Sequence, residues 1–152
     1  MGCGTIGQAI IEGICSIQNP PKQIYVSPRN QEKATRLASK FDQVTLGKDN
    51  QEVIDKSKII FLAVLSRDFL EIMKQLKFRE DHTIISVVSI HRGQALRDAV
   101  APATDIARVI PLPAVALRSG LSIVTDHALA IQIFDQLGST VVAKTDDEFA
   151  AL

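Results

Sequence analysis

The chain contains few of the residues that mark several specialised classes of protein. Its 152 residues include two cysteines, one tyrosine and no tryptophan, and aromatic residues make up 5% of the total. Two cysteines are too few for a disulfide scaffold and fit a reducing compartment. Scarce aromatic residues disfavour a base-stacking surface. The 17 basic and 17 acidic residues cancel, so the chain lacks the basic surplus that attracts nucleic acid or an anionic membrane.

Long hydrophobic runs are missing as well. No apolar run approaches the roughly 20 residues needed to cross a bilayer, and the N-terminus lacks the basic region of a signal peptide. The 46% share of hydrophobic residues is ordinary for a globular domain and too high for a disordered chain. We therefore expect a soluble, cytoplasmic protein with a small-molecule partner and with neither a nucleic-acid nor a membrane partner.

Short β-branched runs alternate with longer helical patterns along the whole chain. The continuously apolar runs at residues 59–64 and 84–88 are typical of strands covered on both faces, as in parallel sheets. The alternation predicts an α/β fold with a mostly parallel sheet and helices on both faces. Strands are predicted at residues 23–27, 44–46, 59–64, 83–88, 107–110, 121–124 and 140–143. Helices are predicted at residues 5–17, 30–41, 50–56, 66–76, 92–100 and 126–137, and residues 146–148 read as the first turn of another.

A glycine motif opens the chain and leads into the first predicted helix. Residues 2–7 read Gly-Cys-Gly-Thr-Ile-Gly, a GxGxxG. In a Rossmann-like domain the first glycine makes a tight turn, the second lets the backbone approach a pyrophosphate, and the third lets the helix pack closely. The helix then directs its first N–H groups at the phosphates. We expect Gly2, Gly4, Thr5, Ile6 and Gly7 to form this loop; a glycine-rich turn without a ligand is the alternative.

The strand that normally precedes such a loop is missing from the sequence, because only Met1 stands before Gly2. We expect the first strand of the sheet to be truncated. A sheet without its middle strand exposes two edges, which favours association. A neighbouring chain that fills the gap, as in a homo-oligomer, remains an open alternative.

A second polar cluster follows the next predicted strand, about twenty residues past the glycine motif. An NAD site usually has an acid there to accept hydrogen bonds from the ribose, whereas this chain has Ser27, followed by Arg29 and Asn30. A hydroxyl, a guanidinium and the first N–H groups of a helix suit a 2′-phosphate. We therefore predict NADP(H) as the cofactor; a polar turn that caps a helix is the alternative.

Taken together, these stretches resemble the pyrroline-5-carboxylate reductase family. The matching segments run in order over nearly the whole chain. They are GCGTIGQAIIEG (residues 2–13), VSPRN (26–30), DNQEVIDKSKIIFLAV (49–64), IISVVS (84–89), RVIPLPAVALRSG (108–120) and LGSTVVAKTDDEFAAL (137–152).

The resemblance implies a fold, a site and an activity. Residues 1–152 would form an NADP-binding Rossmann-like domain, and the C-terminal helical dimerisation domain of the family would be absent. The family's phosphate loop falls on Gly2, Gly4, Thr5, Ile6 and Gly7. Its contacts to the 2′-phosphate of NADP fall on Ser27, Arg29 and Asn30. Its adenosine-side asparagine falls on Asn50, and its Ala-Val turn falls on Ala63 and Val64. The chain departs from the family at 65–66 (Leu-Ser), 89–90 (Ser-Ile) and 112–113 (Leu-Pro), which lie near the expected meeting point of nicotinamide and substrate.

The implied activity is that of an NADP(H)-dependent oxidoreductase, which transfers a hydride to a C=N bond in proline biosynthesis. Two alternatives remain: a non-catalytic dinucleotide-binding or regulatory module, and a related reductase with another imine or carbonyl substrate. No catalytic residue is assigned, although His91 is a candidate proton donor. Ser66-Arg67-Asp68 is expected only to cap the next helix. No metal is expected, because the histidines lack ligand spacing.

Overall fold

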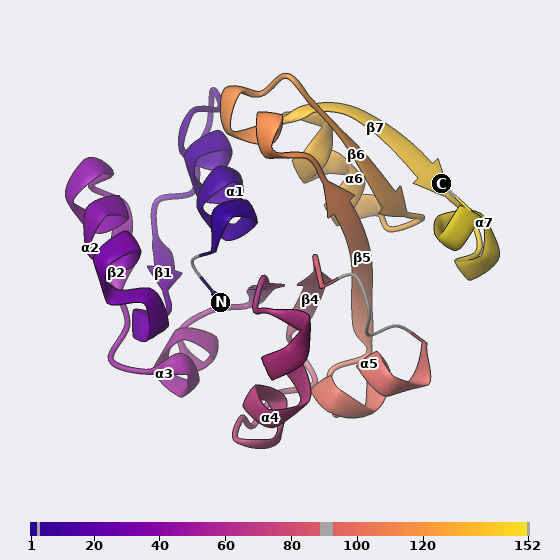
Figure 1. Ribbon diagram of the computed structural model, residues 1–152, viewed down its shortest axis with the longest axis horizontal. Helices are drawn as coiled ribbons and strands as arrows, with labels where there is room; N and C mark the ends of the chain where they lie inside the picture. The colour runs from indigo at the N-terminus through magenta and orange to yellow at the C-terminus, as the bar shows by residue number, and fades with distance from the viewer. Residues whose placement is uncertain (3, 89–92, 152) are drawn as a thin grey trace.

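The computed structural model describes residues 1–2, 4–88 and 93–151, and it has the predicted α/β architecture (Figure 1). The strands are β1 (Ile24–Val26), β2 (Val44–Leu46), β3 (Ile59–Leu62), β4 (Thr83–Ser86), β5 (Asp105–Pro111), β6 (Gly120–Thr125) and β7 (Gly138–Ala143). The helices are α1 (Thr5–Cys15), α2 (Gln31–Lys40), α3 (Asn50–Asp55), α4 (Phe69–Lys74), α5 (Gln94–Val100), α6 (Ala128–Asp135) and α7 (Asp146–Ala151). Short 3-10 turns are η1 (Pro28–Asn30), η2 (Ser66–Asp68) and η3 (Pro113–Leu117).

The strands form two separate sheets. The small sheet pairs β1 with β2 in parallel, and the large one has the order β3-β4-β5-β6-β7. Its pairs are parallel except that β6 runs antiparallel to β5. The carboxyl ends of β3, β4 and β5 therefore share one edge of the large sheet. This arrangement confirms the predicted mostly parallel sheet, with one reversed strand that the sequence did not reveal.

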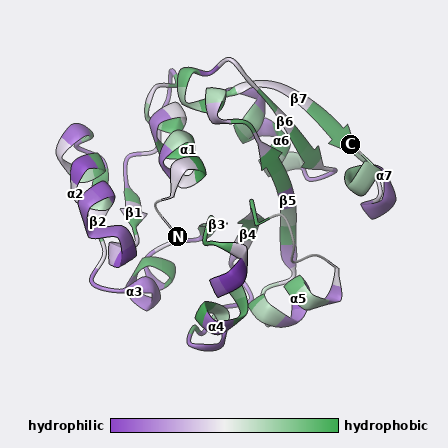
Figure 2. Ribbon diagram, viewed as in Figure 1, coloured by the Kyte–Doolittle hydropathy of each residue, from purple (hydrophilic) through white to green (hydrophobic). Residues whose placement is uncertain are grey.

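Helices cover both faces of the large sheet, as predicted. On one face, α3, α4 and α5 bury Ile54, Phe69 and Leu96 against strands β3 and β4. On the other face, α1 and α6 bury Ile10 and Phe134 against β4 and β5. Figure 2 shows the apolar colour concentrated in the inner strands and polar residues along α2. Each helix is thus amphipathic because one stripe of its surface faces the sheet.

Helix α1 ends two residues before its predicted end. Its apolar stripe continues to Ile17, but the helix ends at Cys15. There the Ser16 N–H donates to the Gly13 carbonyl at 3.0 Å, and the Ile17 N–H donates to the Ile14 carbonyl at 3.5 Å. The predicted helix at residues 66–76 begins with the 3-10 turn η2, and the predicted helix at residues 30–41 follows the 3-10 turn η1, with which it shares Asn30. These differences lie at helix ends, where hydrogen-bond patterns change most easily.

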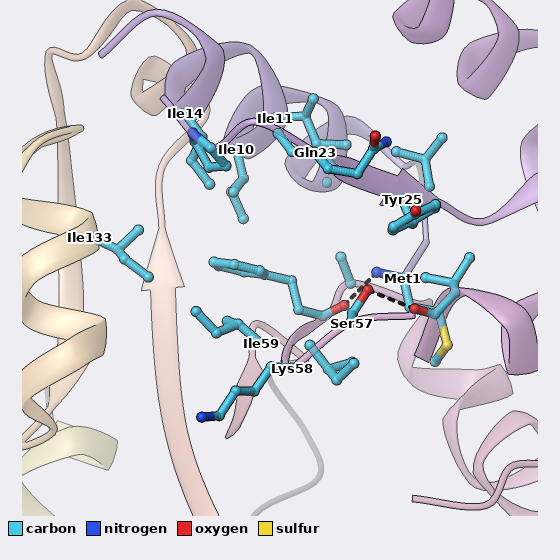
Figure 3. A pocket seen from close by; sticks show the side chains of 18 of the residues that line it. Met1, Ile10, Ile11, Ile14, Gln23, Tyr25, Ser57, Lys58, Ile59 and Ile133 are labelled. Atoms are coloured by element: carbon cyan, nitrogen blue, oxygen red, sulfur yellow. Dashed lines mark hydrogen bonds between the residues drawn. The ribbon is translucent and has the colours of Figure 1, made fainter. Parts of the chain in front are cut away.

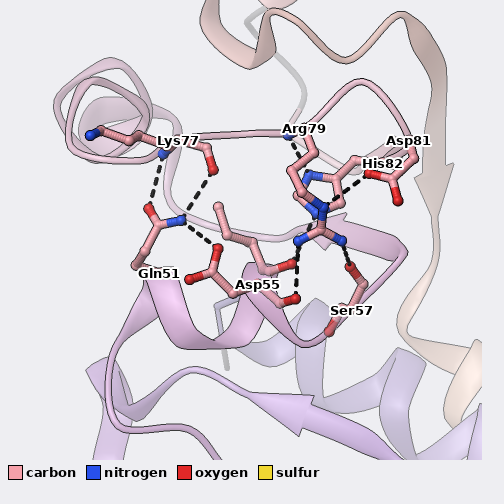
Figure 4. A network of polar contacts seen from close by, with 8 residues as sticks. Gln51, Asp55, Ser57, Lys77, Arg79, Asp81 and His82 are labelled. Atoms are coloured by element: carbon pink, nitrogen blue, oxygen red, sulfur yellow. Dashed lines mark hydrogen bonds and ion pairs between the residues drawn. The ribbon is translucent and has the colours of Figure 1, made fainter.

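A polar network fixes the loop before β4 to the end of α3 (Figure 4). The Arg79 guanidinium donates to the carbonyls of Asp55 at 3.0 Å and Ser57 at 3.1 Å. The buried His82 ring accepts from the Arg79 N–H at 3.0 Å and lies 2.9 Å from the Ile54 carbonyl. Because carbonyls at a helix end lack helical partners, a cation there stabilises the helix. The network therefore fixes the amino-terminal edge of β3 and β4.

No helix among the described residues is long and apolar enough to span a membrane.

Candidate functional site

The glycine motif lies at the N-terminus of α1, against the carboxyl end of β3. Gly2 has a φ of +94°, and a Cβ there would lie 2.6 Å from the Ala63 carbonyl oxygen. A Cβ on Gly7 would lie 2.6 Å from the carbonyl oxygen of Gly2. Both positions exclude a side chain, because such a contact is far inside van der Waals distance. The first and third glycines are therefore required by the fold itself.

Gly4 differs from its two neighbours in the motif. A Cβ at Gly4 would meet no heavy atom within 4 Å, and its φ of −70° suits any residue. Gly4 is the N-cap of α1, where no side chain of the described residues caps the helix and no acidic residue stands in the first turn. The start of this eleven-residue helix therefore lacks a side-chain cap in the part of the chain that the structure describes. Such a helix end attracts an anion.

The second predicted cluster lies at the end of β1. The Ser27 hydroxyl is 1% exposed; it donates to the Asn50 side-chain oxygen at 2.5 Å and accepts from the Arg29 N–H at 3.3 Å. The Asn30 side chain accepts from the Lys33 N–H and caps α2. The structure thus brings Ser27, Arg29 and Asn50 together across 23 residues of sequence. Ser27 is fully engaged in positioning its neighbours.

Arg29 has a charged partner that the sequence reading missed. Its guanidinium lies 3.0 Å from an Asp68 carboxylate oxygen, and the side chains are 48% and 31% exposed. Arg67 lies 3.9 Å from the same carboxylate oxygen. Asp68 is the N-cap residue of α4, within the expected residues 66–68, but its side chain makes no capping hydrogen bond. The sequence does contain an indication of this ion pair. Asp68 follows β3 and Arg29 follows β1, and parallel strands that lie side by side have their carboxyl ends at the same edge.

Ala63 and Val64 extend β3 to the glycine motif. The Ala63 N–H donates to the Met1 carbonyl at 2.9 Å, and Ala63 contacts Gly2 directly, as described above. Leu65 and Leu112 follow β3 and β5 on the shared edge and are 59% and 51% exposed. This edge therefore has polar, anion-attracting groups near β1 and apolar side chains near β3 and β5.

Some sequence predictions fall outside the described residues. Cys3 within the glycine motif, the Ser89-Ile90 substitution and the candidate donor His91 belong to this group. Among the residues that the structure does describe, no three His, Cys, Asp or Glu side chains gather into a group that could hold a metal ion.

Known proteins share both the sequence and the architecture. The model of a family described as NADP oxidoreductase coenzyme F420-dependent matches residues 1–90. A pyrroline-5-carboxylate reductase of Corynebacterium melassecola is 25% identical over 130 residues, which are 82% of this chain and 48% of that protein. The chain spans about half the length of the curated relatives it matches.

Solved structures support the same relationship at the level of the fold. The pyrroline-5-carboxylate reductase of Streptococcus pyogenes has a TM-score of 0.78 at 23% identity, covering 97% of this chain and 57% of that one. The Plasmodium falciparum pyrroline carboxylate reductase with NADP bound gives 0.78 at 19% identity, with 97% and 57% coverage. The chain therefore belongs to the NADP oxidoreductase coenzyme F420-dependent family, and its expected relationship to the pyrroline-5-carboxylate reductases is confirmed.

Proposed function

We propose that residues 1–152 bind NADP(H) as the cofactor domain of a reductase. The observation that carries this proposal is the contrast within the glycine motif. Packing explains Gly2 and Gly7, whereas Gly4 lies beside open space at the uncapped start of α1. An ideal Cβ on Gly4 would meet no described atom within 4 Å, and the helix start beside it has no side-chain cap; this arrangement fits the close approach of a pyrophosphate.

In this proposal the glycine loop holds the pyrophosphate. The N–H groups of Thr5, Ile6 and Gly7 are the first of α1 and donate to phosphate oxygens. The partial positive charge of the helix end favours the same anion. Ala63 and Val64 line the approach from β3, because Ala63 directly contacts Gly2. The P. falciparum relative with NADP bound supports this choice of ligand.

The end of β1 then recognises the ribose 2′-phosphate. Arg29 is 48% exposed and supplies a guanidinium that binds phosphate through paired N–H groups. Asn30 is the N-cap of α2, and its side chain accepts from the Lys33 N–H, so the remaining first N–H groups of α2 are those that face the phosphate in this proposal. Ser27 and Asn50 act through their hydrogen bond, which holds the backbone of η1 in place. Asp68 competes with the phosphate for Arg29, because the ion pair between Arg29 and Asp68 must break before the guanidinium binds an anion.

In the related enzymes named above, the substrate is pyrroline-5-carboxylate, which in this proposal is an intermediate of proline biosynthesis. NADPH held at this edge would supply a hydride to the carbon of the C=N bond, and the imine nitrogen would take a proton from a donor that is not assigned to a residue of this chain. The chain's own residues bind and orient the coenzyme on the carboxyl edge of the sheet. The exposed, apolar Leu65 and Leu112 would exclude water from this edge once coenzyme and substrate cover them. In this proposal, the remaining contacts to the substrate and the contacts of a dimer come from a helical domain, of the kind that the resemblance to the pyrroline-5-carboxylate reductase family implies.

Fluorescence titration with NADPH and NADH tests the proposal. Wild-type protein is expected to bind NADPH at least about tenfold more tightly than NADH. Arg29→Ala should weaken NADPH binding specifically, while Arg36→Ala, which removes an exposed arginine of α2, should leave both affinities unchanged. Equal affinities in the wild type would remove the selectivity claim, and no binding of either coenzyme would remove the proposal.

A second candidate is a dinucleotide-binding module without catalysis. The observation in its favour is Leu112, which stands where the resemblance expects a polar asparagine and is 51% exposed. A leucine cannot hydrogen-bond a carboxamide. A turnover assay with NADPH and pyrroline-5-carboxylate separates the candidates: oxidation of NADPH that depends on the imine supports the reductase, and coenzyme binding without turnover supports the module.

A further inference from the structure

A small polar pocket lies between α5, β5, the end of β6 and the start of α7. It has a volume of about 250 Å³ and is separate from the larger apolar cavity between β1 and β3 (Figure 3). Two arginines line it, Arg97 of α5 and Arg108 of β5, so we call it the arginine pocket. Its other polar side chains are those of Thr104, Thr125 and Asp146.

The arginine pocket lies on the face of the large sheet that is turned away from α1. Ile106 packs in the core that α4 and α5 cover, whereas Ala107 and Val109 pack in the core with Ile10 of α1. Successive side chains of a strand point to opposite faces, so Arg108 shares the face of Ile106. The pocket is also smaller than the roughly 300–1,000 Å³ of sites for larger organic ligands. A small ligand therefore suits it, and the pyrophosphate at the glycine motif lies elsewhere.

Arg108 places a positive charge inside the fold. Its side chain belongs to a residue that is 7% exposed, and its Nε and Nη1 atoms are buried. Arginine keeps its charge in proteins, and a buried charge is costly unless an opposite charge lies close to it. An anion in the arginine pocket would therefore lower the free energy of this guanidinium.

Neighbouring groups hold Arg108 in one orientation. Its Cζ atom lies 4.2 Å from the centre of the Phe149 ring, and its backbone N–H donates to the Thr125 hydroxyl oxygen at 3.0 Å. Stacking on a ring uses the face of a guanidinium, whereas the N–H donors lie in its plane. The stacked arginine thus presents its donors edge-on, which is the geometry that binds the oxygens of phosphate in pairs.

The other lining groups add donors from separate directions. Arg97 brings a second guanidinium from α5. The Thr125 hydroxyl oxygen accepts from the Arg108 N–H, so its own proton is directed away from that strand and can be donated to a ligand. Thr104 adds an exposed hydroxyl before β5. Donors that come from several sides suit a tetrahedral oxyanion better than a planar carboxylate.

Asp146 is the acidic residue among the described residues that line the pocket. The acidic side chains of α5 and β5 are engaged with other groups: Asp98 accepts from a glutamine of its own helix at 2.6 Å, and Asp105 accepts from Thr83 and pairs with His127. The two arginines therefore outweigh one carboxylate in the pocket. Asp146, which is exposed at the start of α7, competes with a bound anion for them.

We propose that the arginine pocket binds a small tetrahedral oxyanion between Arg97 and Arg108, either inorganic phosphate or the phosphate group of a small ester. The anion neutralises the buried charge of Arg108 and joins α5, β5 and β6 through one ligand. This site is distinct from the proposed coenzyme site, so its test contains no coenzyme.

The test follows amide NMR spectra of the full chain during titration with inorganic phosphate, at constant pH and at an ionic strength held constant with sodium chloride. The amides of Arg97 and Thr125 should shift and saturate with a Kd of about 1–10 mM. A second titration uses glycerol 3-phosphate. Equal affinities identify the free ion as the ligand, and tighter binding of glycerol 3-phosphate identifies an ester; both results support the site.

Two substitutions at exposed positions separate this site from general attraction of anions. Arg97→Ala should weaken phosphate binding at least about tenfold, because one charged donor is lost. Asp146→Asn should tighten it at least about threefold, because the competing carboxylate is removed. Arg36→Ala, an equal loss of charge on α2, is the control and should change nothing. Any shift that phosphate also causes at residues 5–7 should persist in Arg97→Ala.

Three results would overturn the proposal. One is the absence of a saturable shift at the Arg97 and Thr125 amides up to about 50 mM phosphate, since binding that weak lies outside the millimolar range. Another is wild-type affinity in both Arg97→Ala and Asp146→Asn. The third is equal weakening by Arg36→Ala and Arg97→Ala, because the total charge of the chain would then account for the binding.

Discussion

The three glycines of the motif have different physical reasons to be glycine. A side chain at Gly2 or Gly7 collides with backbone atoms, whereas a Cβ at Gly4 meets no atom of the described residues within 4 Å. The sequence alone predicted the motif and its helix, because both are local patterns. The sequence could not show that Gly2 and Gly7 are required by packing whereas Gly4 is required by the ligand, since that distinction depends on which atoms lie next to each Cα in the folded chain.

Alanine substitutions test this separation. Gly7→Ala should destabilise the fold, because overpacking against a backbone atom costs about 1–3 kcal/mol and exceeds the about 1 kcal/mol that alanine gains in a helix. Gly4→Ala should leave Tm within about 2 °C of the wild type and weaken NADPH binding at least about tenfold. Thermal unfolding and coenzyme titration measure the two effects. A Gly4→Ala protein that binds NADPH normally would contradict the assigned role.

Sequence reasoning did not pair Asp68 with Arg29, which lies 39 positions away in the chain, although both residues follow strands whose carboxyl ends lie at the same edge. Asp68→Asn should tighten NADPH binding about threefold to tenfold, since the phosphate no longer competes with a carboxylate for Arg29, and partly exposed ion pairs are worth up to about 1 kcal/mol. NADH affinity should not change. Asp126→Asn, an equal change of charge after β6, is the control. Unchanged NADPH affinity in Asp68→Asn would show that Asp68 does not oppose the phosphate.

Asp105 contributes a pH-dependent part of stability at the start of β5. Hydrogen bonds from the Thr83 hydroxyl at 2.8 Å and then from His127 lower the pKa of this carboxyl. A carboxyl with a lowered pKa stabilises the folded state above its unfolded pKa of about 4, and this contribution is lost as pH falls through the folded pKa. Thr83→Val should move the pKa of Asp105 back toward its ordinary value, as followed by NMR titration. An unchanged titration would exclude Thr83 as the main cause.

At the scale of elements, local pattern predicted which segments are helices and strands. The apolar stripe of α1 and the apolar runs of β3 and β4 fall at the predicted positions. The reversal of β6 and the turn η3 were not predicted, because they depend on contacts between distant segments. A Cβ on Gly13 of α1 would lie 2.3 Å from the carbonyl oxygen of Val115 in η3, a close approach that joins segments about a hundred residues apart and that no local pattern encodes.

The end of α3 offers an element-scale prediction. Arg79→Ala removes two hydrogen bonds to carbonyls at that helix end and the ion pair with Asp81. The free energy of unfolding should fall by about 1–3 kcal/mol, because charged hydrogen bonds to partly buried groups are lost. Arg36→Ala removes only an exposed pair within α2 and should cost less than about 0.5 kcal/mol. Urea denaturation compares them, and equal losses would refute the capping role of Arg79.

At the scale of the whole molecule, the fold consists of the small sheet β1-β2 and the large sheet β3-β4-β5-β6-β7, with an apolar cavity between β1 and β3. The sequence predicted the mostly parallel sheet with helices on both faces. It could not predict that Met1 would pair with β3 or that apolar side chains would line the cavity, since both depend on how the two sheets meet. The polar groups of the candidate site lie at the carboxyl edge of the strands.

The most direct test of the central claim maps where the coenzyme binds. Amide NMR spectra of the isotope-labelled chain are recorded during titration with NADPH and, separately, with NADH. NADPH should shift the amides of Thr5, Ile6 and Gly7 together with that of Arg29, and NADH should shift the first three but leave Arg29 almost unchanged. Shifts confined to β7 and α6, or none at residues 5–7 under saturating NADPH, would contradict the account.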